Sequence, residues 1–585
     1  MKSFFKIFLA SLLALVVLCV IIFFVLIGFV TSITADEKAR TGAKAVLVVD
    51  LAHDYPEIGV ENPLARFSGK EDGDAPSLYD VVRLIHHAKT DTAVKGIYIK
   101  CGSNANGMGA SQEIRNALMD FKTSGKFIYA YGDVITQGGY SVGNIANRIY
   151  CNPKGGVDWR GFAVQLAFLK GLLQKLEIEP QIFYAGKFKS ATEPFRETSM
   201  TDANRLQLSV MMNDMYGRLL QQTAETRKLD TATLHQYANE YRIQYAADAV
   251  KYGLVDGLKY DDEVKMEIAA KLGGVKLDKL NFITVQKYAK AVEFKHDGKE
   301  RIAVIYAQGD IIDGKGDRDM IGSITYRDLV RKARLDDKIK AIVIRINSGG
   351  GSALASENIW RELTLARKAK PVVVSFGDVA ASGAYYLSCN ADSIFAQTNT
   401  ITGSIGVFTM LPNMQKFFND KLGITFDGVK TAPQADMLSA TKPLTPAQRI
   451  FLQNSVDSIY YTFKDRVAQG RKKDINYIDS IGQGRVWSGS RALELGLVDR
   501  LGGLDDAIGC AARMAKVSDY RLREYPEPHN VLDMIFGGYE KDAAKSALKS
   551  ELGEDGLKTY QTMKRVKQMV GVTQARIPFE FNIEY

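Results

Sequence analysis

Hydrophobic residues are concentrated in one long run at the start of the chain. Lys2 and Lys6 precede residues 7–30, which carry no charge. As a helix rising 1.5 Å per residue, this run is about 36 Å long, enough to cross a hydrocarbon core of about 30 Å. A cleavable signal peptide has a shorter apolar region and a small-x-small site, which residues 33–35 match poorly. We therefore predict an uncleaved signal anchor with one transmembrane helix at residues 1–40. The two lysines predict that the rest of the chain lies on the outer, periplasmic side of the inner membrane.

Beyond this run, short apolar stretches alternate with amphipathic segments. Apolar stretches of this length, broken by glycine and polar turns, are typical of strands buried on both faces of a parallel sheet. The segments between them have helical periodicity, so we predict an α/β fold with crossover connections. The predicted strands are 45–51, 96–99, 127–131, 302–307, 341–346 and 372–376, and the predicted helices include 111–121, 356–368 and two that begin at Thr201 and Thr445.

The body of the chain is a tandem repeat. Residues 97–149 align without a gap to residues 342–394, so that Gly132-Asp133-Val134 recurs as Gly377-Asp378-Val379. Further on, the Gly-Leu-Val-Asp segment at 253–256 recurs at 496–499. A fixed offset over this length indicates two copies of one supersecondary unit.

The repeat predicts the domain organisation. We expect one repeat at 41–265, a connector at 266–300 and a second repeat at 301–510. The last segment, 511–585, does not repeat. Its pattern predicts a helix over 541–570 and a strand near 577–583.

Composition excludes several classes of protein. With 585 residues, 46% hydrophobic and 24% charged, the chain is neither disordered nor collagenous. The net charge of +9 is spread without a long Lys/Arg block, so we interpret it as a solvated surface and predict no nucleic-acid partner. The five cysteines form no C-x-x-C pair and the six histidines no H-E-x-x-H pair. A disulfide scaffold and a metal site are therefore not predicted, and no cofactor is implied.

The first candidate for chemistry is a serine in the second repeat. Ser382 stands among small residues after a predicted strand, followed by Gly383 at the start of a helix. A nucleophile of acyl transfer is often presented in this way, with the next backbone N–H facing the same site. A serine at this place is also an ordinary helix cap. The repeat favours chemistry, because the equivalent residue in the first half is Gln137 while the flanking motif persists.

The second candidate is a lysine in the first repeat. Lys189 belongs to a Lys-Ser-Ala-Thr-x-Pro segment, and anchoring on Ser-Ala-Thr-x-Pro places Leu438 opposite it in the second repeat. The first half thus keeps the lysine and lacks the serine, whereas the second half keeps the serine and lacks the lysine. Two degenerate sites that complement each other suggest one composite site per chain.

A glycine-rich turn, Asn347-Ser348-Gly349-Gly350-Gly351-Ser352, follows another predicted strand of the second repeat. Glycines there let backbone N–H groups approach a ligand, so the turn suits a phosphate cradle or an oxyanion hole. It is not a P-loop, because no Gly-Lys-Ser/Thr follows at the required spacing. A simple tight turn is an equal alternative.

These motifs together resemble the long, tandem-repeat members of the signal peptide peptidase A family, which are membrane-anchored Ser/Lys proteases of the Clp/crotonase fold. The resemblance covers nearly the whole chain. The family's base motif is met by residues 189–195, its Ala-Ser-Gly-x-Tyr motif by 381–385 and its Thr-Gly-Ser-Ile-Gly motif by 402–406. Its Asn-Ser-Pro-Gly-Gly turn is met with one departure, since Gly349 stands where proline is usual.

The resemblance implies the roles of the site residues. Ser382 would be the nucleophile and Lys189 the general base, with Ser404 supporting the lysine and the N–H groups of Gly350 and Gly383 forming the oxyanion hole. A free lysine has a pKa of about 10.4, and burial lowers this value enough to leave a neutral base.

The resemblance also implies what the protein does and with whom. We expect a serine endopeptidase that degrades released signal peptides and other extended hydrophobic peptides at the inner membrane. A homotetramer is expected, without metal or nucleotide. Two alternatives are a non-proteolytic membrane scaffold on the same fold and a crotonase-type acyl-CoA enzyme. The scaffold would predict loss of Ser382 or Lys189, and both are present. The acyl-CoA enzyme would leave the Ser/Lys pair unexplained.

Overall fold

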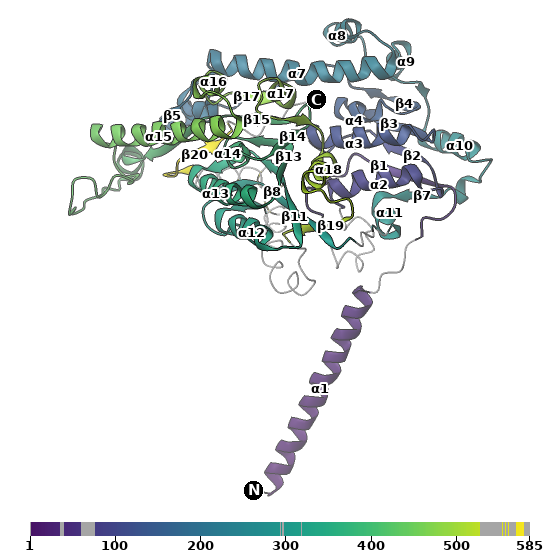
Figure 1. The fold of residues 1–585 in the computed structure, drawn as a ribbon, viewed down its shortest axis with the longest axis horizontal. Coiled ribbons are helices and arrows are strands. Elements are labelled where there is room, and N and C mark those ends of the chain that lie inside the picture. The colour runs from purple at the N-terminus through teal and green to yellow at the C-terminus, as the bar shows by residue number, and fades with distance from the viewer. Residues whose placement is uncertain are drawn as a thin grey trace.

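A computed structural model describes residues 2–34, 40–59, 76–292, 298–317, 319–526 and 569–577, together with positions 294, 551, 553, 556 and 560. Helix α1 (Lys2–Thr34) stands apart from the folded body, and the apolar side chains described along it are exposed (Figure 1). A search of the described residues for a helix long and apolar enough to cross a membrane finds none. The transmembrane helix therefore stays a prediction.

The first half is built on a parallel six-stranded sheet with the order β6-β4-β3-β2-β1-β7. Its central strands are almost fully buried, as expected for a sheet covered on both faces. The strands are β1 (Ala45–Asp50), β2 (Val94–Lys100), β3 (Phe127–Ile135), β4 (Arg148–Val157), β6 (Gly257–Leu258) and β7 (Phe282–Thr284). The helices of this half are α2 (Leu78–Thr90), α3 (Met108–Lys122), α4 (Gln137–Gly143), α5 (Lys170–Lys175), α6 (Glu193–Arg196), α7 (Asp202–Arg227), α8 (Thr231–Asn239), α9 (Ala246–Lys251), α10 (Asp261–Lys271) and α11 (Val285–Ala291).

The second half repeats this plan with the order β17-β15-β13-β11-β8-β19, and β14 and β18 continue from β13. All pairs are parallel except β15 with β17. The strands are β8 (Glu300–Gln308), β11 (Ile339–Ser348), β13 (Val372–Ala381), β14 (Ser393–Ala396), β15 (Ile401–Gly403), β17 (Val486–Ser488), β18 (Arg500–Leu501) and β19 (Tyr520–Tyr525). The helices are α12 (Ser323–Leu335), α13 (Ala353–Ala369), α14 (Gly383–Ser388), α15 (Pro446–Arg471), α16 (Ile475–Ile481), α17 (Gly489–Glu494) and α18 (Leu504–Ala515).

The repeat extends further than its sequence signal. Strand β7 lies in the predicted connector and pairs with β1, and β19 lies in the predicted extension and pairs with β8. Both are edge strands in equivalent places of the two sheets. The segments predicted as connector and extension thus each add a strand to a sheet.

A third sheet joins the two halves, with the order β10-β9-β12-β20-β16-β5. Strand β5 (Glu179–Ala185) comes from the first repeat and pairs antiparallel with β16 (Val407–Asn413) of the second. Strand β20 (Gln574–Arg576) comes from the C-terminal segment and lies between β12 (Gly350–Ser352) and β16. The remaining strands are β9 (Asp310–Ile312) and β10 (Met320–Gly322).

The predicted strands and helices of the two repeats are confirmed, with ends that differ by a few residues. Thr201 and Thr445 are N-caps of α7 and α15, since each side-chain oxygen accepts a backbone N–H three residues on. The helix predicted over 541–570 falls almost wholly outside the described residues. Of the strand predicted near 577–583, only residue 577 is described, and the strand found there, β20, ends one residue earlier.

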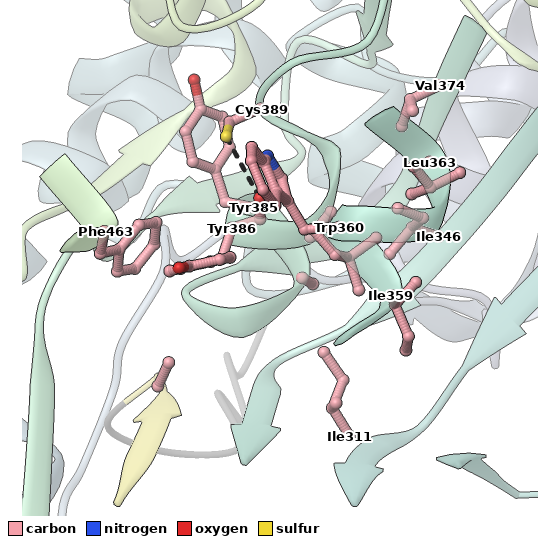
Figure 2. Close-up of a cluster of buried hydrophobic side chains, with 14 of the residues drawn as sticks. Ile311, Ile346, Ile359, Trp360, Leu363, Val374, Tyr385, Tyr386, Cys389 and Phe463 are labelled. Carbon is pink, nitrogen blue, oxygen red and sulfur yellow. Dashed lines mark hydrogen bonds between the residues drawn. The ribbon is translucent and has the colours of Figure 1, made fainter. Parts of the chain in front are cut away.

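Aromatic packing fixes the short helix α14, which follows Ser382 directly. Tyr385 and Tyr386 are buried in the core of the second half beside Trp360 of α13 (Figure 2). The Tyr386 ring lies 4.7 Å from that of Phe463, and the Tyr385 hydroxyl donates to the Leu497 carbonyl at 2.8 Å. This packing holds the start of α14, and hence the turn before it, in one position.

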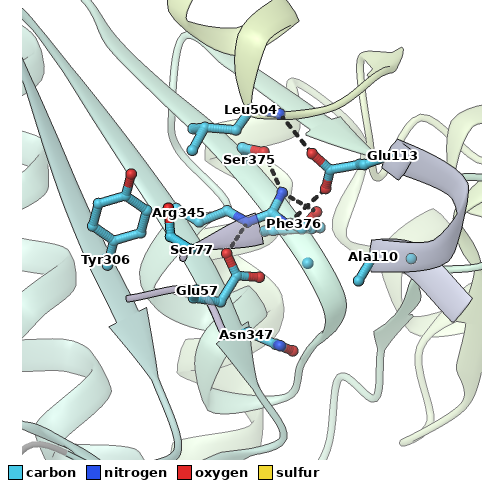
Figure 3. Close-up of polar contacts among 12 residues, drawn as sticks. Glu57, Ser77, Ala110, Glu113, Tyr306, Arg345, Asn347, Ser375, Phe376 and Leu504 are labelled. Carbon is cyan, nitrogen blue, oxygen red and sulfur yellow. Dashed lines mark hydrogen bonds and ion pairs between the residues drawn. The ribbon is translucent and has the colours of Figure 1, made fainter. Parts of the chain in front are cut away.

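Buried polar contacts hold the two halves together. Arg345 on β11 is 1% exposed and binds two carboxylates from the first half, Glu57 at 2.9 Å and Glu113 at 2.6 Å (Figure 3). Nearby, an Asp378 carboxylate oxygen accepts the backbone N–H groups of Gly109 and Ala110 at the start of α3. Strands β11 and β13, which lead to the glycine-rich turn and to Ser382, are thus both tied to the first half.

Candidate active site

Ser382 occupies a sharp turn between β13 and α14. Its backbone has φ of 55° and ψ of −113°, a conformation that is strained for a residue with a Cβ atom. The Ser382 N–H donates to the Gly403 carbonyl at 2.8 Å, which ties the turn to β15. The Ser382 hydroxyl lies 3.4 Å from the Gly406 carbonyl oxygen, to which it donates.

Lys189 reaches this hydroxyl from the first repeat. Strand β5 carries the chain along β16, and the residues after it turn at Gly186, whose φ is +105°. The Lys189 Nζ lies 2.8 Å from Ser382 Oγ, 3.0 Å from Ser404 Oγ and 3.3 Å from the Ser404 carbonyl oxygen. The structure therefore brings together Ser382, Lys189 and Ser404, which the sequence placed in one site.

Burial determines the charge of this lysine. Lys189, Ser382 and Ser404 are all 0% exposed. Burial lowers the pKa of Lys189 well below 10.5, because the charged ammonium loses its hydration. A neutral amine can accept a proton from a serine hydroxyl, so the lowered pKa and the 2.8 Å contact are those expected of a nucleophile and its general base.

The loop that carries Lys189 is braced by residues that the motif analysis did not assign. The buried Glu193 carboxylate accepts the Thr201 hydroxyl at 2.5 Å and the Asn204 amide at 2.8 Å. Gln207, also buried, donates its amide to Ser190 Oγ at 2.5 Å and to the Phe188 carbonyl at 3.1 Å. Glu193, which lies inside the base motif at 189–195, thus fixes the loop to the start of α7. The sequence could have pointed to Gln207, because it is a polar residue on a helix face that is otherwise mostly apolar.

The two predicted oxyanion residues lie side by side. A Cβ atom added to Gly350, whose φ is +97°, would come within 2.8 Å of the Gly383 nitrogen and 2.1 Å of the Ala575 carbonyl oxygen. Only glycine leaves this space free. The Gly350 N–H donates to Ser348 Oγ at 3.2 Å in this structure, so this donor is engaged within the turn.

Gly349, where the resemblance expects proline, faces the C-terminal segment. A Cβ atom there would meet the Ile577 side chain at 2.9 Å, and the Gly349 carbonyl accepts the Ile577 N–H at 2.9 Å. The smaller residue therefore makes room for Ile577.

The equivalent place in the first half holds no nucleophile. Gln137, at the position of Ser382, accepts the N–H groups of Arg160 and Gly161 and donates to the Gly161 carbonyl. Its amide is used in binding a loop. Among the described residues, no group of three or more His, Cys, Asp or Glu side chains could hold a metal ion.

Comparison with known proteins places the chain in a family. The sequence pattern of peptidase family S49 matches it twice, at residues 120–276 and 364–518. The chain is 38% identical to Protease 4 of Salmonella typhi over 471 residues, covering 78% of this chain and 75% of that protein. It is 33% identical over 464 residues to the chloroplastic serine protease SPPA of Arabidopsis thaliana, covering 77% and 68%.

Solved structures add little to this. A mutant of the membrane-bound stomatin-specific protease 1510-N, in complex with a substrate peptide, aligns at a TM-score of 0.27 and 15% identity. The alignment covers 42% of this chain and 99% of the other. We draw no conclusion about this chain from a structural similarity this low. The two matched repeats and the long alignments are sufficient: the chain belongs to peptidase family S49.

Proposed function

We propose that this serine protease cleaves peptide bonds with Ser382 as nucleophile and Lys189 as general base, one residue from each repeat. The observation that carries the proposal is the 2.8 Å contact between the Lys189 Nζ and Ser382 Oγ, both fully buried. Burial lowers the pKa of Lys189 well below 10.5 and so favours the neutral amine, whose nearest hydroxyl is that of a serine in a strained turn.

The chemistry follows from this contact. Neutral Lys189 takes the Ser382 hydroxyl proton as Oγ attacks the substrate carbonyl carbon, and the resulting ammonium gives that proton to the leaving amine as the C–N bond breaks. Water, deprotonated by the same lysine, then cleaves the acyl-enzyme and regenerates Ser382. Ser404 Oγ, at 3.0 Å from Nζ, orients the lysine, and Gly350 and Gly383 are the proposed donors to the oxyanion.

Extended hydrophobic peptides, chiefly signal peptides released from secreted proteins, are the proposed substrates. A relative in Enterococcus faecium, 34% identical over 197 residues, is named a putative signal peptide peptidase SppA. A fully buried site suits an unfolded chain, because a folded protein cannot bring a backbone carbonyl to a buried serine.

A serine-directed fluorophosphonate probe tests the site assignment. We expect the full chain to be labelled once, at Ser382, because this hydroxyl lies nearest the Lys189 Nζ, at 2.8 Å, and directly precedes Gly383, a proposed oxyanion donor. Peptide mapping by mass spectrometry identifies the labelled residue, with heat-denatured protein as the control that should remain unlabelled. Labelling at Ser404 or at another serine would contradict the assignment.

The proposal extends to an inner-membrane tetramer with its catalytic part on the periplasmic side. The uncharged run at residues 7–30 after Lys2 and Lys6 supports the anchor. Exposed apolar side chains in one segment of the second half, Leu422, Ile424, Phe426, Val429 and Leu438, support contacts between copies.

Membrane attachment and assembly are tested on one preparation. We expect the full chain to sediment with membranes through a carbonate wash, since an integral span resists it. We expect the chain to elute after detergent extraction at the mass of four copies. A chain released by carbonate, or a monomer in detergent at micromolar concentration, would refute the corresponding half of this prediction.

A further inference from the structure

A cavity in the first repeat is lined by residues of α3, α4 and α7, among them Gln137, which stands at the position equivalent to Ser382. Asn399, on the connection between β14 and β15, contributes to it from the second half. The cavity has a volume of about 30 Å³. Since a single water needs roughly 10–15 Å³, the cavity has room for a group the size of a carboxylate.

In the second repeat, aromatic rings fill the equivalent space. Trp360 and Tyr386 are both buried there, and the Tyr386 ring lies 4.7 Å from that of Phe463 (Figure 2). The first repeat has smaller side chains at two of these three positions and an arginine at the third, which explains why a cavity with a polar wall forms there. The equivalent pairs are Arg115 with Trp360, Ser141 with Tyr386 and, on the two 26-residue helices α7 and α15, Leu219 with Phe463.

The arginine in the wall of the cavity is buried without a negative partner. Arg115 is 2% exposed, and its Nη1 donates to the Ser141 carbonyl at 2.7 Å and to the Asn144 side-chain oxygen, both of which are neutral. Among the described residues, no carboxylate lies within ion-pair distance of its guanidinium. Burial and the charge of Arg218 lower the pKa of Arg115 to about 9, although Glu225 opposes this. A buried cation beside a second cation favours an anion in the cavity.

The two repeats differ in charge at the same place. In the second repeat, Arg466 forms an ion pair with Glu357 at 2.9 Å. The equivalent residues of the first repeat are Gln222 and Gln112, and the Gln222 amide donates to the Gln112 side-chain oxygen at 2.5 Å. The first repeat therefore has a buried arginine where the second has tryptophan, and it lacks the carboxylate that balances the charge in the second.

We propose that this cavity binds the carboxylate group of a ligand whose other end is apolar, with Arg115 as the cation that pairs with it. The Nε and Nη2 groups of Arg115 make no hydrogen bond to the described residues, and these two groups form an edge that a carboxylate can bind through both oxygens. The apolar part of the ligand would contact the other lining residues, Met108, Phe162, Met215 and Leu219.

The ligand class is therefore an organic acid with an apolar chain, and its carboxylate can come from a free acid or from the C-terminus of a short apolar peptide. The inference goes beyond the proposed function, because it concerns a binding site of the first repeat and no step of peptide hydrolysis.

Isothermal titration calorimetry of the full chain in a Ser382→Ala background tests the proposal without any hydrolysis. The probes are hexanoate and N-acetyl-alanyl-leucine, each compared with its neutral amide. We expect the acids to bind at least about thirtyfold more tightly than the amides, because an amide leaves the buried cation unpaired. The acid that binds more tightly identifies the source of the carboxylate.

Two variants locate the binding. Arg115→Gln removes the cation, and Ser141→Tyr introduces the residue of the second repeat, which fills the cavity and keeps the cation. Each should weaken the binding of the tighter acid at least about thirtyfold. Arg205→Gln, the same change at an exposed arginine of α7, is the control and should leave the affinity unchanged.

Circular dichroism verifies that each variant is folded, and Ser141→Tyr decides the question if Arg115→Gln does not fold. Equal affinities for acid and amide, no binding of either acid at millimolar concentration, or full affinity in folded Ser141→Tyr would overturn the proposal. Because binding is measured without Ser382, these results are independent of whether the chain hydrolyses peptides.

Discussion

Replacing Ser382 or Lys189 by alanine is expected to lower kcat/KM for a fluorogenic, leucine-containing peptide at least about ten-thousandfold. Residues that act as one catalytic unit each cost nearly the whole rate enhancement when removed. Ser382→Ala removes the atom that bonds to the substrate. Lys189→Ala leaves the serine proton without an acceptor, since the other partner of Ser382 Oγ is the Gly406 carbonyl at 3.4 Å, which cannot take a proton. The double variant should be no worse than either single one.

Lys187→Ala is the matched control, because Lys187 is an exposed lysine two residues away on the same loop. It should keep the activity of the unaltered chain. Retained activity in Ser382→Ala would refute the assignment of Ser382 as the nucleophile. It would favour the non-proteolytic scaffold, in which Ser382 and Lys189 have no chemical role. A circular dichroism melt of each variant separates loss of chemistry from loss of fold.

The dependence of activity on pH gives a second measure of the same lysine. Since burial lowers the pKa of Lys189 well below 10.5, the neutral base is present above that lowered value and is lost as pH falls through it. The kcat/KM of the unaltered chain should therefore rise with pH as one proton is lost, with a midpoint far below that of a free lysine. A midpoint near 10.5 would show that Lys189 is solvated and protonated at neutral pH.

Sequence alone predicted the chemistry of the site better than its surroundings. Ser382 and Lys189 were found because each is missing from the other repeat, at Gln137 and Leu438, while the flanking residues persist. The parallel strands could be predicted because a strand buried on both faces of a sheet has a continuous apolar sequence, whichever strand it pairs with. Both signals are local in sequence.

The third sheet could not be predicted in this way, because pairing between distant strands leaves no periodic signal. Strand β12 is Gly-Gly-Ser, which has no apolar pattern, and β20 is a three-residue strand from a segment that does not repeat. Strand β5 was not predicted as a strand; its residues lie in the predicted first repeat, whereas its partner β16 belongs to the second. The sheet that positions Lys189 against Ser382 is thus the part of the fold that only the structure shows.

A site divided between two repeats depends on the contact between them, and Arg345 is a fully buried arginine in that contact. Its guanidinium binds Glu57 and Glu113 of the first half and also donates to Ser375 Oγ and to the Phe376 carbonyl (Figure 3). Two carboxylates share one cation, and burial raises the pKa of Glu113 to about 7 although Arg345 opposes this. The arginine supplies the only positive charge that the structure shows in contact with these two carboxylates among the described residues.

Arg345→Ala is therefore expected to destabilise the chain by roughly 3–5 kcal/mol, the usual cost of leaving buried charges without their partner. The loss should depend on pH in a definite direction. A carboxyl whose pKa is raised by folding holds its proton more tightly in the folded state, so its effect is absent below about pH 4.5 and destabilising as pH rises toward 7. Without Arg345 the pKa of Glu113 rises further, and the deficit in the free energy of unfolding, from urea denaturation, should be larger at pH 8 than at pH 5.

Two further variants separate the buried charges from the size of the side chain. Arg361→Ala, at an exposed arginine of α13, should leave the unfolding curve unchanged. Combining Arg345→Met with Glu57→Gln and Glu113→Gln removes every charge of the cluster and should recover most of the stability lost in Arg345→Ala, since a neutral cluster has no carboxylate to desolvate. If Arg345→Ala has the same deficit at both pH values, the arginine stabilises the interface by packing alone. If the deficit grows with pH as expected, the ionic cluster is what keeps Lys189 of one repeat within reach of Ser382 of the other.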